Sequence, residues 1–507
     1  MHEKTDIIET KSGKVQGYIN NGIQIFKGIP YAASPVGRLR FSPPAEREAW
    51  SNVHDATKHG PYVYQGFSPL DALFGKPGWQ SETDCLTLNI WTPNIDNARR
   101  PVMVWIHGGG YITGGGAFPI YDGSNLTRRG NVVVVTINYR LGALGFLNAA
   151  GVTANIGMLD QIAALKWIRD NIEIFGGDPN NILTFGESAG GISVITLMAM
   201  PAANGLFHRV ISQSAPMLMP KPARKSTENL FRELDIKEGD IDALRKIPPE
   251  KIIAAQDKVL AKLEKEGTNE IMDFRPRIDG DVLPTHPLEA LRKGAGKNID
   301  LLIGSNKDEY KLWTILDPRF KEIKEETFPR LISALLSRMD IDDTKSLQIL
   351  EVYKDTMKDV ASTNPIEIFD AIGTDFVFRI PEIRFAEAHQ IHNSNVYNYF
   401  FTWPSPAFKG KLGSCHAMEI PFAFGTLDVP KADLFFGKGP DADLLSEKMM
   451  DTWIAFAHTG NPNHKDIPEW PAYDTKKRAT MVLGTEWKVE NALLDKERKA
   501  WDGILEI

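Results

Sequence analysis

Long apolar runs along the chain predict the strands of a central sheet. Residues 101–106 and 132–137 are two such runs, rich in β-branched side chains, and they are typical of strands covered on both faces. Residues 209–213, 301–304 and 396–401 predict further strands. Because strands of this kind lie inside a protein, we expect the sheet to form the core.

Helical periodicity lies between these strands. From residue 157 to residue 175 apolar side chains recur every three or four positions, which predicts a crossover helix. Residues 5–30 differ, because turn residues break them into short strands that predict a meander at the edge of the sheet. The alternation of strand and helix predicts an α/β fold with a mostly parallel sheet and helices on both faces.

Two polar stretches are predicted to be insertions into this fold. Residues 224–270 and 320–393 are rich in Glu, Lys, Leu and Ile at helical spacing. We expect helical cap insertions there, although such charges also describe an ordinary solvated helix face. The sequence has no recognisable repeat or linker, so we expect residues 1–507 to form a single domain.

Composition and charge narrow the class of protein. The chain has 507 residues and a net charge of −7 at pH 7, which disfavours nucleic acids and anionic membrane surfaces as partners. It contains no apolar run of about eighteen residues, so no membrane-spanning helix is predicted. It opens with a polar segment, so no signal peptide is predicted either.

The number of cysteines indicates whether the protein acts in an oxidising or a reducing compartment. Cys85 and Cys415 are too few for a disulfide framework, and a single bridge would form only if the fold brought them together. This cysteine usage fits a reducing compartment. We therefore predict a cytoplasmic protein, either a monomer or a homodimer.

A short motif carries the first chemical hypothesis. Gly186-Glu187-Ser188-Ala189-Gly190 follows an apolar run at 181–185 and precedes a mostly apolar stretch at 191–198 that predicts a helix. A G-x-S-x-G sequence in this setting makes a tight turn that exposes the serine hydroxyl at a helix N-terminus. The pattern alone has many chance matches, so the hypothesis needs a base, an acid and an oxyanion hole elsewhere in the chain.

A glycine loop supplies a candidate oxyanion hole. His107-Gly108-Gly109-Gly110 directly follows the predicted strand at 101–106. Glycines let backbone N–H groups turn inward toward an oxyanion, together with the N–H of Ala189 after the serine. The alternative is a plain flexible loop.

An acid and a base follow the later strands. Asp308 and Glu309 come after residues 301–304, at the end of a parallel strand where ligands bind. His416 lies on a loop beyond residues 396–401. Taken singly, the acids could be surface carboxylates and the histidine a structural residue. Their order along the chain, serine then acid then histidine, is that of an α/β-hydrolase triad.

Cofactor and metal motifs are not recognisable in the sequence. The glycines at 108–110 and 114–116 do not make a G-x-G-x-x-G dinucleotide motif. His389 and His392 have no matching cluster of ligands. We therefore predict neither a cofactor nor a metal site.

Several segments together resemble the type-B carboxylesterases of the carboxylesterase/cholinesterase family, especially its bacterial members that are similar to para-nitrobenzyl esterase. The resemblance runs from near residue 10 to near residue 464, and residues 175–191 are its most specific part. The other matching segments are residues 26–32, 84–90, 107–110, 138–142, 307–309 and 416–422. The resemblance implies an α/β-hydrolase fold and a carboxylic ester hydrolase.

The resemblance also implies roles for individual residues. It makes Ser188 the nucleophile, His416 the base and Glu309, in preference to Asp308, the acid. It assigns the oxyanion hole to the backbone N–H groups of Gly109, Gly110 and Ala189.

Supporting residues are implied in the same way. Glu187 and Ser214 are expected behind the triad, and Arg140 is expected to form an ion pair with Asp160. The wall of the substrate pocket is expected to include aromatic and apolar side chains, which suit an apolar acyl or alcohol group. The expected residues are Tyr111, Phe118, Leu312 and Trp313, although ordinary core packing explains Tyr111 and Phe118 equally well.

The sequence departs from the family at two places. Secreted members bridge the cysteine at Cys85 to a partner, and Val63 stands where that partner would be, which supports an intracellular setting. The family segment Ser-Glu-Asp-Cys reads Ser-Glu-Thr-Asp-Cys at 81–85. The glutamate that would pair with Arg40 is therefore either displaced or replaced by Thr83.

The predicted activity is hydrolysis of short- to medium-chain carboxylic esters through an acyl-enzyme. The choline-binding tryptophan of cholinesterases has no counterpart at a matched position, because Trp79 lies at a different distance from Cys85. Choline esters are therefore not the favoured substrates. The alternatives are a lipase or another acyl hydrolase of the same fold and, from another class, a non-catalytic cholinesterase-like binding protein.

Overall fold

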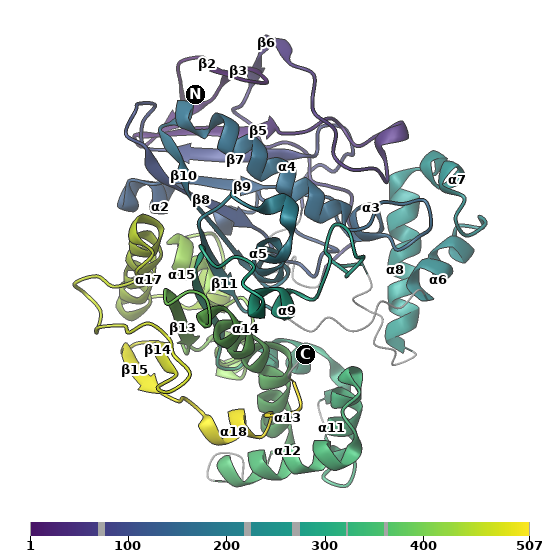
Figure 1. The fold of residues 1–507 in the computed structure, drawn as a ribbon, viewed down its shortest axis with the longest axis vertical. Coiled ribbons are helices and arrows are strands. Elements are labelled where there is room, and N and C mark those ends of the chain that lie inside the picture. Colours follow the sequence, from purple (N-terminus) through teal and green to yellow (C-terminus); the bar gives the residue numbers. More distant parts are fainter. Residues whose placement is uncertain are drawn as a thin grey trace. The chain divides into compact units, whose positions relative to one another are not determined.

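The structure is a computed structural model that describes residues 2–68, 77–216, 225–265, 274–320, 323–358 and 364–505. The chain divides into two compact units. The first contains Met1–Ile211 and Lys221–His286, and the second contains Ser212–Pro220 and Pro287–Ile507. Figure 1 labels the helices and strands of both units.

The first unit is built on a large sheet. Its strands lie in the order β1, β4, β5, β7, β9, β8 and β10, in which β9–β8 and β8–β10 are parallel pairs and the other pairs are antiparallel (Figure 1). The runs at 101–106 and 132–137 form β8 and β9, and every residue of these strands is buried, as predicted. The bounds are β1 (Glu3–Lys4), β4 (Tyr18–Asn20), β5 (Ile23–Pro30), β7 (Thr87–Thr92), β8 (Arg100–Ile106), β9 (Val133–Ile137) and β10 (Gly177–Glu187).

Not all of the first strands join this sheet. β2 (Ile8–Thr10) and β3 (Gly13–Gln16) pair with β6 (Trp50–Asp55) in a separate three-stranded sheet. The predicted meander is therefore only half right, because its strands divide between two sheets. Gly17 separates β3 from β4, and a Cβ at this position would lie 2.1 Å from the carbonyl oxygen of Ile25, so glycine permits the close crossing.

Helices connect and cover the parallel strands. The periodic segment at 157–175 forms α4 (Ile156–Asn171) and a short 3-10 turn, which confirms the predicted crossover helix between β9 and β10. α4 and α5 (Ala189–Ala199) contact each other and β10 (Figure 1). The other helices of this unit are α2 (Ser124–Gly130), α3 (Gly142–Phe146), α6 (Lys225–Glu233), α7 (Ile241–Lys246) and α8 (Pro249–Lys265).

The second unit contains β12 (Asp300–Asn306), β13 (Val396–Phe401), β14 (Ala479–Leu483) and β15 (Lys488–Asn491), paired in that order. The first three run parallel, and β15 is antiparallel to β14. The predicted strands at 301–304 and 396–401 are thereby confirmed. β11 (Arg209–Gln213) carries the chain from the first unit into the second.

The helices of the second unit include α14, which contacts β12 and β13 (Figure 1). A π-helical turn at Asp375–Arg379 directly precedes it. The helices are α9 (Pro287–Arg292), α10 (Lys311–Leu316), α11 (Phe328–Leu336), α12 (Asp343–Thr356), α13 (Pro365–Thr374), α14 (Ile380–Gln390), α15 (Ile420–Phe424), α16 (Ala432–Phe436), α17 (Pro440–Thr459) and α18 (Asp495–Lys499).

Both predicted insertions contain helices. α6, α7 and α8 lie within 224–270, and α11 to α14 lie within 320–393. The helices α11 to α14 share an apolar core with Trp501 and Leu505, so their amphipathic pattern reflects packing as well as solvation. Their role as a cap and the single-domain arrangement stay predictions. Residues 224, 266–270, 321, 322 and 359–363 lie outside the described residues.

A buried ion pair ties the loop after β9 to α4. The Arg140 guanidinium donates to both carboxylate oxygens of Asp160, at 2.7 Å each, and both side chains are almost fully buried. The backbone N–H of Arg140 also donates to Asp160, at 3.1 Å. The ion pair implied by the resemblance is therefore present.

Glu82 keeps a partner despite the extra residue beside it. Arg40 Nε donates to Glu82 Oε1 at 2.8 Å, and a second guanidinium N–H contacts the other carboxylate oxygen. Residues 83 and 84 form a turn in which Asp84 has a positive φ of 55°. The turn takes up Thr83, so the glutamate is Glu82 and has not been replaced.

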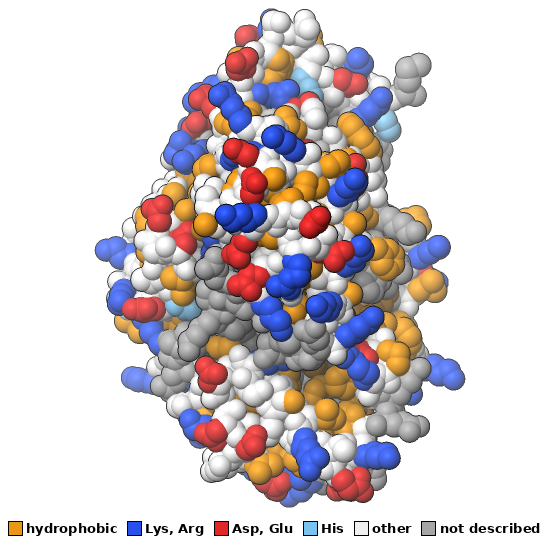
Figure 2. All heavy atoms as spheres, turned by 90° about the vertical axis from the view of Figure 1, so that its right-hand side faces the viewer, with side chains coloured by type: hydrophobic (Ala, Val, Ile, Leu, Met, Phe, Trp, Pro, Cys, Tyr) orange, Lys and Arg blue, Asp and Glu red, His pale blue; other side chains and the backbone are white. Residues whose placement is uncertain are grey.

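Charged side chains of both signs are intermixed on the face shown in Figure 2, with apolar side chains between them. This pattern agrees with the modest net charge of −7. Among the described residues, no helix combines the length and the apolar character that crossing a membrane requires.

Candidate active site

The motif around Ser188 forms a strained turn between a strand and a helix. β10 ends at Glu187, α5 begins at Ala189, and Ser188 between them has φ 57° and ψ −122°. A non-glycine residue with positive φ is strained, and such strain collects at functional sites. A Cβ on Gly190 would lie 1.9 Å from the carbonyl oxygen of Ile106, so only glycine allows α5 to begin this close to β8. The predicted strand, turn and helix are confirmed.

The glycine loop lies against this turn. Gly186 of β10 pairs in register with Ile106 of β8, so the two strands end side by side and their following residues leave the same edge of the sheet. A Cβ on Gly108 would lie 2.7 Å from the carbonyl oxygen of Glu187 and 3.1 Å from Ser188 Cβ. Backbone of the loop therefore reaches the serine where a side chain would not fit.

Three backbone donors are available beside Ser188. Gly109 and Gly110 have φ values of 103° and 62°, which disfavour any residue with a Cβ. Within the part of the chain that the structure describes, the N–H groups of Gly109, Gly110 and Ala189 make no hydrogen bond to another protein group. Two donors from a glycine loop and a third at the start of α5 suit a developing negative charge.

His107 and Tyr139 stabilise the start of the glycine loop. The ring of His107 stacks on Tyr139 with 4.4 Å between centroids, and the Tyr139 hydroxyl donates to the His107 carbonyl at 2.8 Å. Burial lowers the pKa of His107 to about 4, so the ring is neutral at pH 7. His107 is therefore a structural residue of the glycine loop.

The predicted acid, Glu309, and the predicted base, His416, contact each other in the second unit. His416 Nδ1 lies 2.7 Å from Glu309 Oε2, and both side chains are almost completely buried. The backbone N–H of Asn306, the last residue of β12, donates to Glu309 Oε1 at 2.7 Å. This arrangement holds the carboxylate against the imidazole and orients the ring.

Asp308, the acidic residue before Glu309, makes different contacts. Asp308 accepts from the backbone N–H of Ser414 at 2.9 Å and lies 3.1 Å from the ammonium of Lys311. It therefore fastens the loop that carries the histidine, while Glu309 faces the imidazole.

Two aromatic rings lie next to the ring of His416. The ring centroids of Trp313 and Phe378 lie 5.0 and 4.9 Å from that of His416, and the two rings stack on each other at 5.8 Å. Phe378 belongs to the π-helical turn at Asp375–Arg379, and such turns are frequent at functional sites. Phe378 was not predictable from the sequence, because no sequence signal marks a π-helical turn.

Two further glutamates near Glu309 are buried. Glu419 belongs to the segment 416–422 of the resemblance and is not the surface carboxylate that it could have been, whereas no sequence signal marks Glu382. Glu419 accepts from the side-chain amides of Asn306 at 2.7 Å and Gln213 at 3.2 Å. Burial, followed by the charge of Glu309, raises the pKa of Glu419 to about 6. Glu382 accepts from the backbone N–H of Ala215 at 3.0 Å, and the same two causes hold its pKa well above the usual range.

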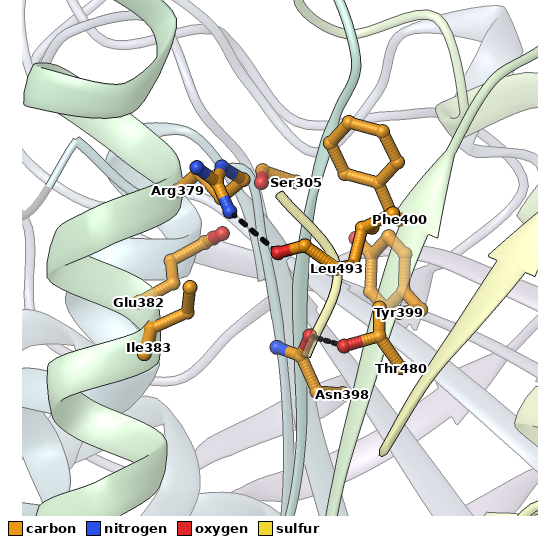
Figure 3. Close-up of a pocket in the computed structure, with 9 residues that line it drawn as sticks. All are labelled: Ser305, Arg379, Glu382, Ile383, Asn398, Tyr399, Phe400, Thr480 and Leu493. Atoms are coloured by element: carbon orange, nitrogen blue, oxygen red, sulfur yellow. Dashed lines mark hydrogen bonds between the residues drawn. The ribbon is translucent and has the colours of Figure 1, made fainter. Parts of the chain in front are cut away.

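A small cavity adjoins Glu382. Figure 3 shows Glu382 and Arg379 on one side of it, with Ser305, Asn398 and Thr480 on the strands opposite. Its volume is about 20 Å³, enough for one water molecule, and its lining is polar and apolar in about equal parts.

The predicted supporting residues occupy both units. Glu187 is buried in the first unit, against Gly108 of the glycine loop. Ser214 is fully buried in the second unit with φ 46°, and its N–H donates to the carbonyl of Gly304 at 2.8 Å. Their roles behind the triad stay predictions.

The predicted pocket residues differ in exposure. Tyr111 is fully buried, and its hydroxyl accepts from Ser193 at 3.1 Å, while Phe118 is buried against Tyr62. Leu312 is buried as well, whereas 42% of Trp313 is exposed beside His416. Trp313 is the one of the four whose ring reaches both solvent and the histidine, and the pocket as a whole stays a prediction.

One group of side chains has the spacing of metal ligands. Asp451, His464 and Asp466 offer ligand atoms within 4.8 Å of one another, a grouping that the sequence analysis did not recognise. All three are at least partly exposed, and exposed acidic groups commonly lie this close without a metal. The grouping therefore does not establish a metal site.

The comparisons with known proteins cover nearly the whole chain. The profile of the carboxylesterase family matches residues 4–501. The para-nitrobenzyl esterase of Bacillus subtilis is 39% identical over 497 residues, which are 96% of each chain, and the phenmedipham hydrolase of Pseudarthrobacter oxydans is 36% identical over 95% of each chain. A solved carboxylesterase of Geobacillus stearothermophilus is 38% identical with a TM-score of 0.87, covering 98% of this chain and 100% of that one.

Fold and comparisons together define the class, which is that of the α/β hydrolases. The chain belongs to the carboxylesterase family. It is a carboxylic ester hydrolase that acts on small-molecule esters, and the serine mechanism is general to this family.

Proposed function

We propose that Ser188, His416 and Glu309 form the catalytic triad of this esterase. The observation that carries the proposal is the buried contact of 2.7 Å between Glu309 and His416 Nδ1. Because Nδ1 is engaged by the acid, Nε2 is the ring nitrogen that takes the proton from the serine hydroxyl. The positive φ of Ser188 supports its role as the nucleophile.

In the proposed reaction, the Ser188 oxygen attacks the ester carbonyl and His416 accepts the hydroxyl proton. Glu309 stabilises the imidazolium, which then protonates the departing alcohol and leaves an acyl-enzyme on Ser188. Water, deprotonated by His416, releases the acid and restores the serine.

The N–H groups of Gly109, Gly110 and Ala189 are the proposed oxyanion hole. Their lack of protein partners, within the described residues, supports this assignment. One such donor is worth about 10²- to 10³-fold in kcat. Glu187, Ser214, Glu419 and Glu382 are proposed to support the triad from behind.

We propose small esters with short- to medium-chain acyl groups as substrates. The half-exposed ring of Trp313 beside His416 supports an apolar wall near the reacting carbonyl. The name of one relative, para-nitrobenzyl esterase, points to an aromatic alcohol group.

The compartment and the assembly are part of the proposal. Cys85 and Cys415 are both free and buried, which supports the cytoplasm as the site of action. We propose a monomer or a homodimer, which light scattering of the purified protein distinguishes.

The triad is tested by Ser188→Ala. We expect kcat for a small ester to fall about 10⁴-fold or more, because the nucleophile is lost, with an unchanged melting temperature. The control is Ser193→Ala, which removes a buried hydroxyl from α5, the helix that follows Ser188, and should keep nearly full kcat. A folded Ser188→Ala protein with wild-type turnover would refute the proposal.

The lipase alternative is tested by acyl length. With one alcohol group and a series of acyl groups, kcat/KM should be highest for acyl groups such as butanoyl and hexanoyl and lowest for palmitoyl. A maximum at palmitoyl, with activation by an oil–water interface, would favour a lipase instead.

A further inference from the structure

A buried glutamine outside the proposed catalytic residues contacts the glycine loop. The Gly114 N–H donates to Gln65 Oε1 at 2.7 Å, and Gln65 Nε2 donates to the Gly114 carbonyl at 2.8 Å. The Gln65 side chain is buried, so both hydrogen bonds are shielded from water. One side-chain amide therefore holds both polar groups of one backbone residue.

Gly114 is packed against the start of the loop that carries the proposed donors. A Cβ on Gly114 would lie 2.5 Å from His107 Nδ1 and 2.6 Å from the Gly108 carbonyl oxygen. The Gly109 carbonyl accepts from the N–H of Thr113 at 3.0 Å, which closes a tight turn between the donors and Gly114. A displacement of Gly114 would therefore also displace Gly109 and Gly110.

Gln65 is itself anchored. Its backbone N–H donates to Gln80 Oε1 at 3.0 Å, and its Nε2 also donates to the Val63 carbonyl at 3.1 Å. Tyr62 and Gln80 form a parallel β-bridge. Both segments belong to the first unit, as does the glycine loop, so the contact lies inside one compact body.

The amide is chemically suited to this place. It offers a donor to the Gly114 carbonyl and an acceptor to the Gly114 N–H at the same time. An ionised carboxylate has no proton to donate and would repel the carbonyl oxygen. An apolar side chain would leave two buried backbone groups unsatisfied, at a cost of about 1–3 kcal/mol each.

We propose that Gln65 is a positioning residue of the oxyanion hole, which keeps the N–H groups of Gly109 and Gly110 aimed at the developing oxyanion. The proposal rests on the function proposed above. Donors act through preorganisation, so a small displacement lowers transition-state binding while ground-state binding changes little. Loss of the contact should therefore lower kcat and leave KM nearly unchanged.

The test is Gln65→Glu, which replaces the side-chain amide nitrogen with a carboxyl oxygen. The control is Asn155→Asp, because Asn155 Oδ1 accepts from the Arg277 N–H and Asn155 Nδ2 donates to the Arg277 carbonyl, both at 2.8 Å, outside the glycine loop. Both variants turn a buried amide with two contacts to one backbone residue into a carboxyl group. Asn155 Nδ2 also donates to Asp279 Oδ2 at 3.1 Å, so Asn155→Asp places a second carboxyl group beside that carboxylate and carries a cost in stability at least as large as that of Gln65→Glu. Gln65→Asn, which keeps the amide but withdraws it by one methylene, is a second variant.

We expect Gln65→Glu to lower kcat about 10- to 100-fold, less than the loss of a whole donor, and to weaken a trifluoromethyl ketone inhibitor by a similar factor. KM should change less than about threefold, since ground-state binding is kept. The deficit should grow as pH rises, because the introduced carboxyl donates only while protonated. Asn155→Asp should keep kcat, and Gln65→Asn should lie between wild type and Gln65→Glu.

Two results would overturn the proposal. One is a wild-type kcat in a folded Gln65→Glu protein, and the other is an equal loss of kcat in the Gln65→Glu and Asn155→Asp proteins at matched melting temperatures. Ser188→Ala, measured alongside, separates the two claims. An inactive Ser188→Ala protein with an unaffected Gln65→Glu protein contradicts only the role of Gln65, whereas an active Ser188→Ala protein contradicts the proposed triad.

Discussion

Asp160 carries a charge that lies entirely out of water. It is fully buried, and Arg140 supplies three hydrogen bonds to its carboxylate. Asp160→Asn should lower the free energy of unfolding by about 3–5 kcal/mol, because it leaves the buried guanidinium without its counter-charge. Urea unfolding measures this change.

The control for that substitution lies on the same helix. Asp170 is exposed in α4 and pairs with Arg169 at the surface, so Asp170→Asn should change the free energy of unfolding by no more than about 0.5 kcal/mol. Similar effects of the two substitutions would show that the buried pair adds nothing to stability.

For single residues, the sequence predicted candidate site residues more readily than the contacts that these residues make. Ser188, Glu309 and His416 were recognisable from motifs, but the residues alone left Asp308 and Glu309 equivalent, since both follow β12. The geometry of the following turn, which depends on the Ser414 loop, separates them. Phe378 was not predictable, because its place depends on a π-helical turn rather than on sequence spacing.

The contact between α10 and α13 contains a carboxyl group that should make stability depend on pH. Asp370 of α13 accepts from the Thr314 hydroxyl of α10 at 2.7 Å. Burial raises the pKa of Asp370 to about 7, from 3.8 for an exposed aspartate. The folded state therefore binds this proton more tightly, and the stabilisation present below about pH 4 is lost as the pH rises to 7.

Asp370→Asn removes this titration. Between pH 5 and pH 8, the wild type should lose about 2–3 kcal/mol of unfolding free energy relative to the variant, at up to about 1.4 kcal/mol per pH unit. Chemical unfolding across that range measures the difference. Parallel curves for the two proteins would mean that Asp370 is charged throughout.

Strands and helices with a strong local pattern were predictable from the sequence, whereas the pairing of the short strands into sheets was not. The apolar runs of β8, β9, β12 and β13 and the period of α4 identified these elements before the structure. The division of residues 5–30 between two sheets was not readable, because short alternating strands look alike whichever sheet they join. The close approach at Gly17, which separates the two sheets, depends on a residue 8 positions further along, Ile25.

Over the whole molecule, the family assignment depends on agreement along nearly the full chain. The profile match over residues 4–501 and a TM-score of 0.87 include both compact units. The proposed triad includes Ser188 of the first unit and Glu309 and His416 of the second. The sequence predicts these three residues from their order along the chain and from the family motifs, neither of which requires knowledge of how the chain packs.

The central claim, that Ser188 becomes acylated with His416 as its base, is tested most directly by covalent labelling. The enzyme is treated with a fluorophosphonate, and the intact mass and the labelled peptide are measured by mass spectrometry, with and without excess ester. We predict one adduct per chain, located on Ser188, slowed by the ester and by His416→Ala, and absent in Ser188→Ala. An adduct on another residue, or no adduct in an enzyme that still hydrolyses the ester, would contradict the account.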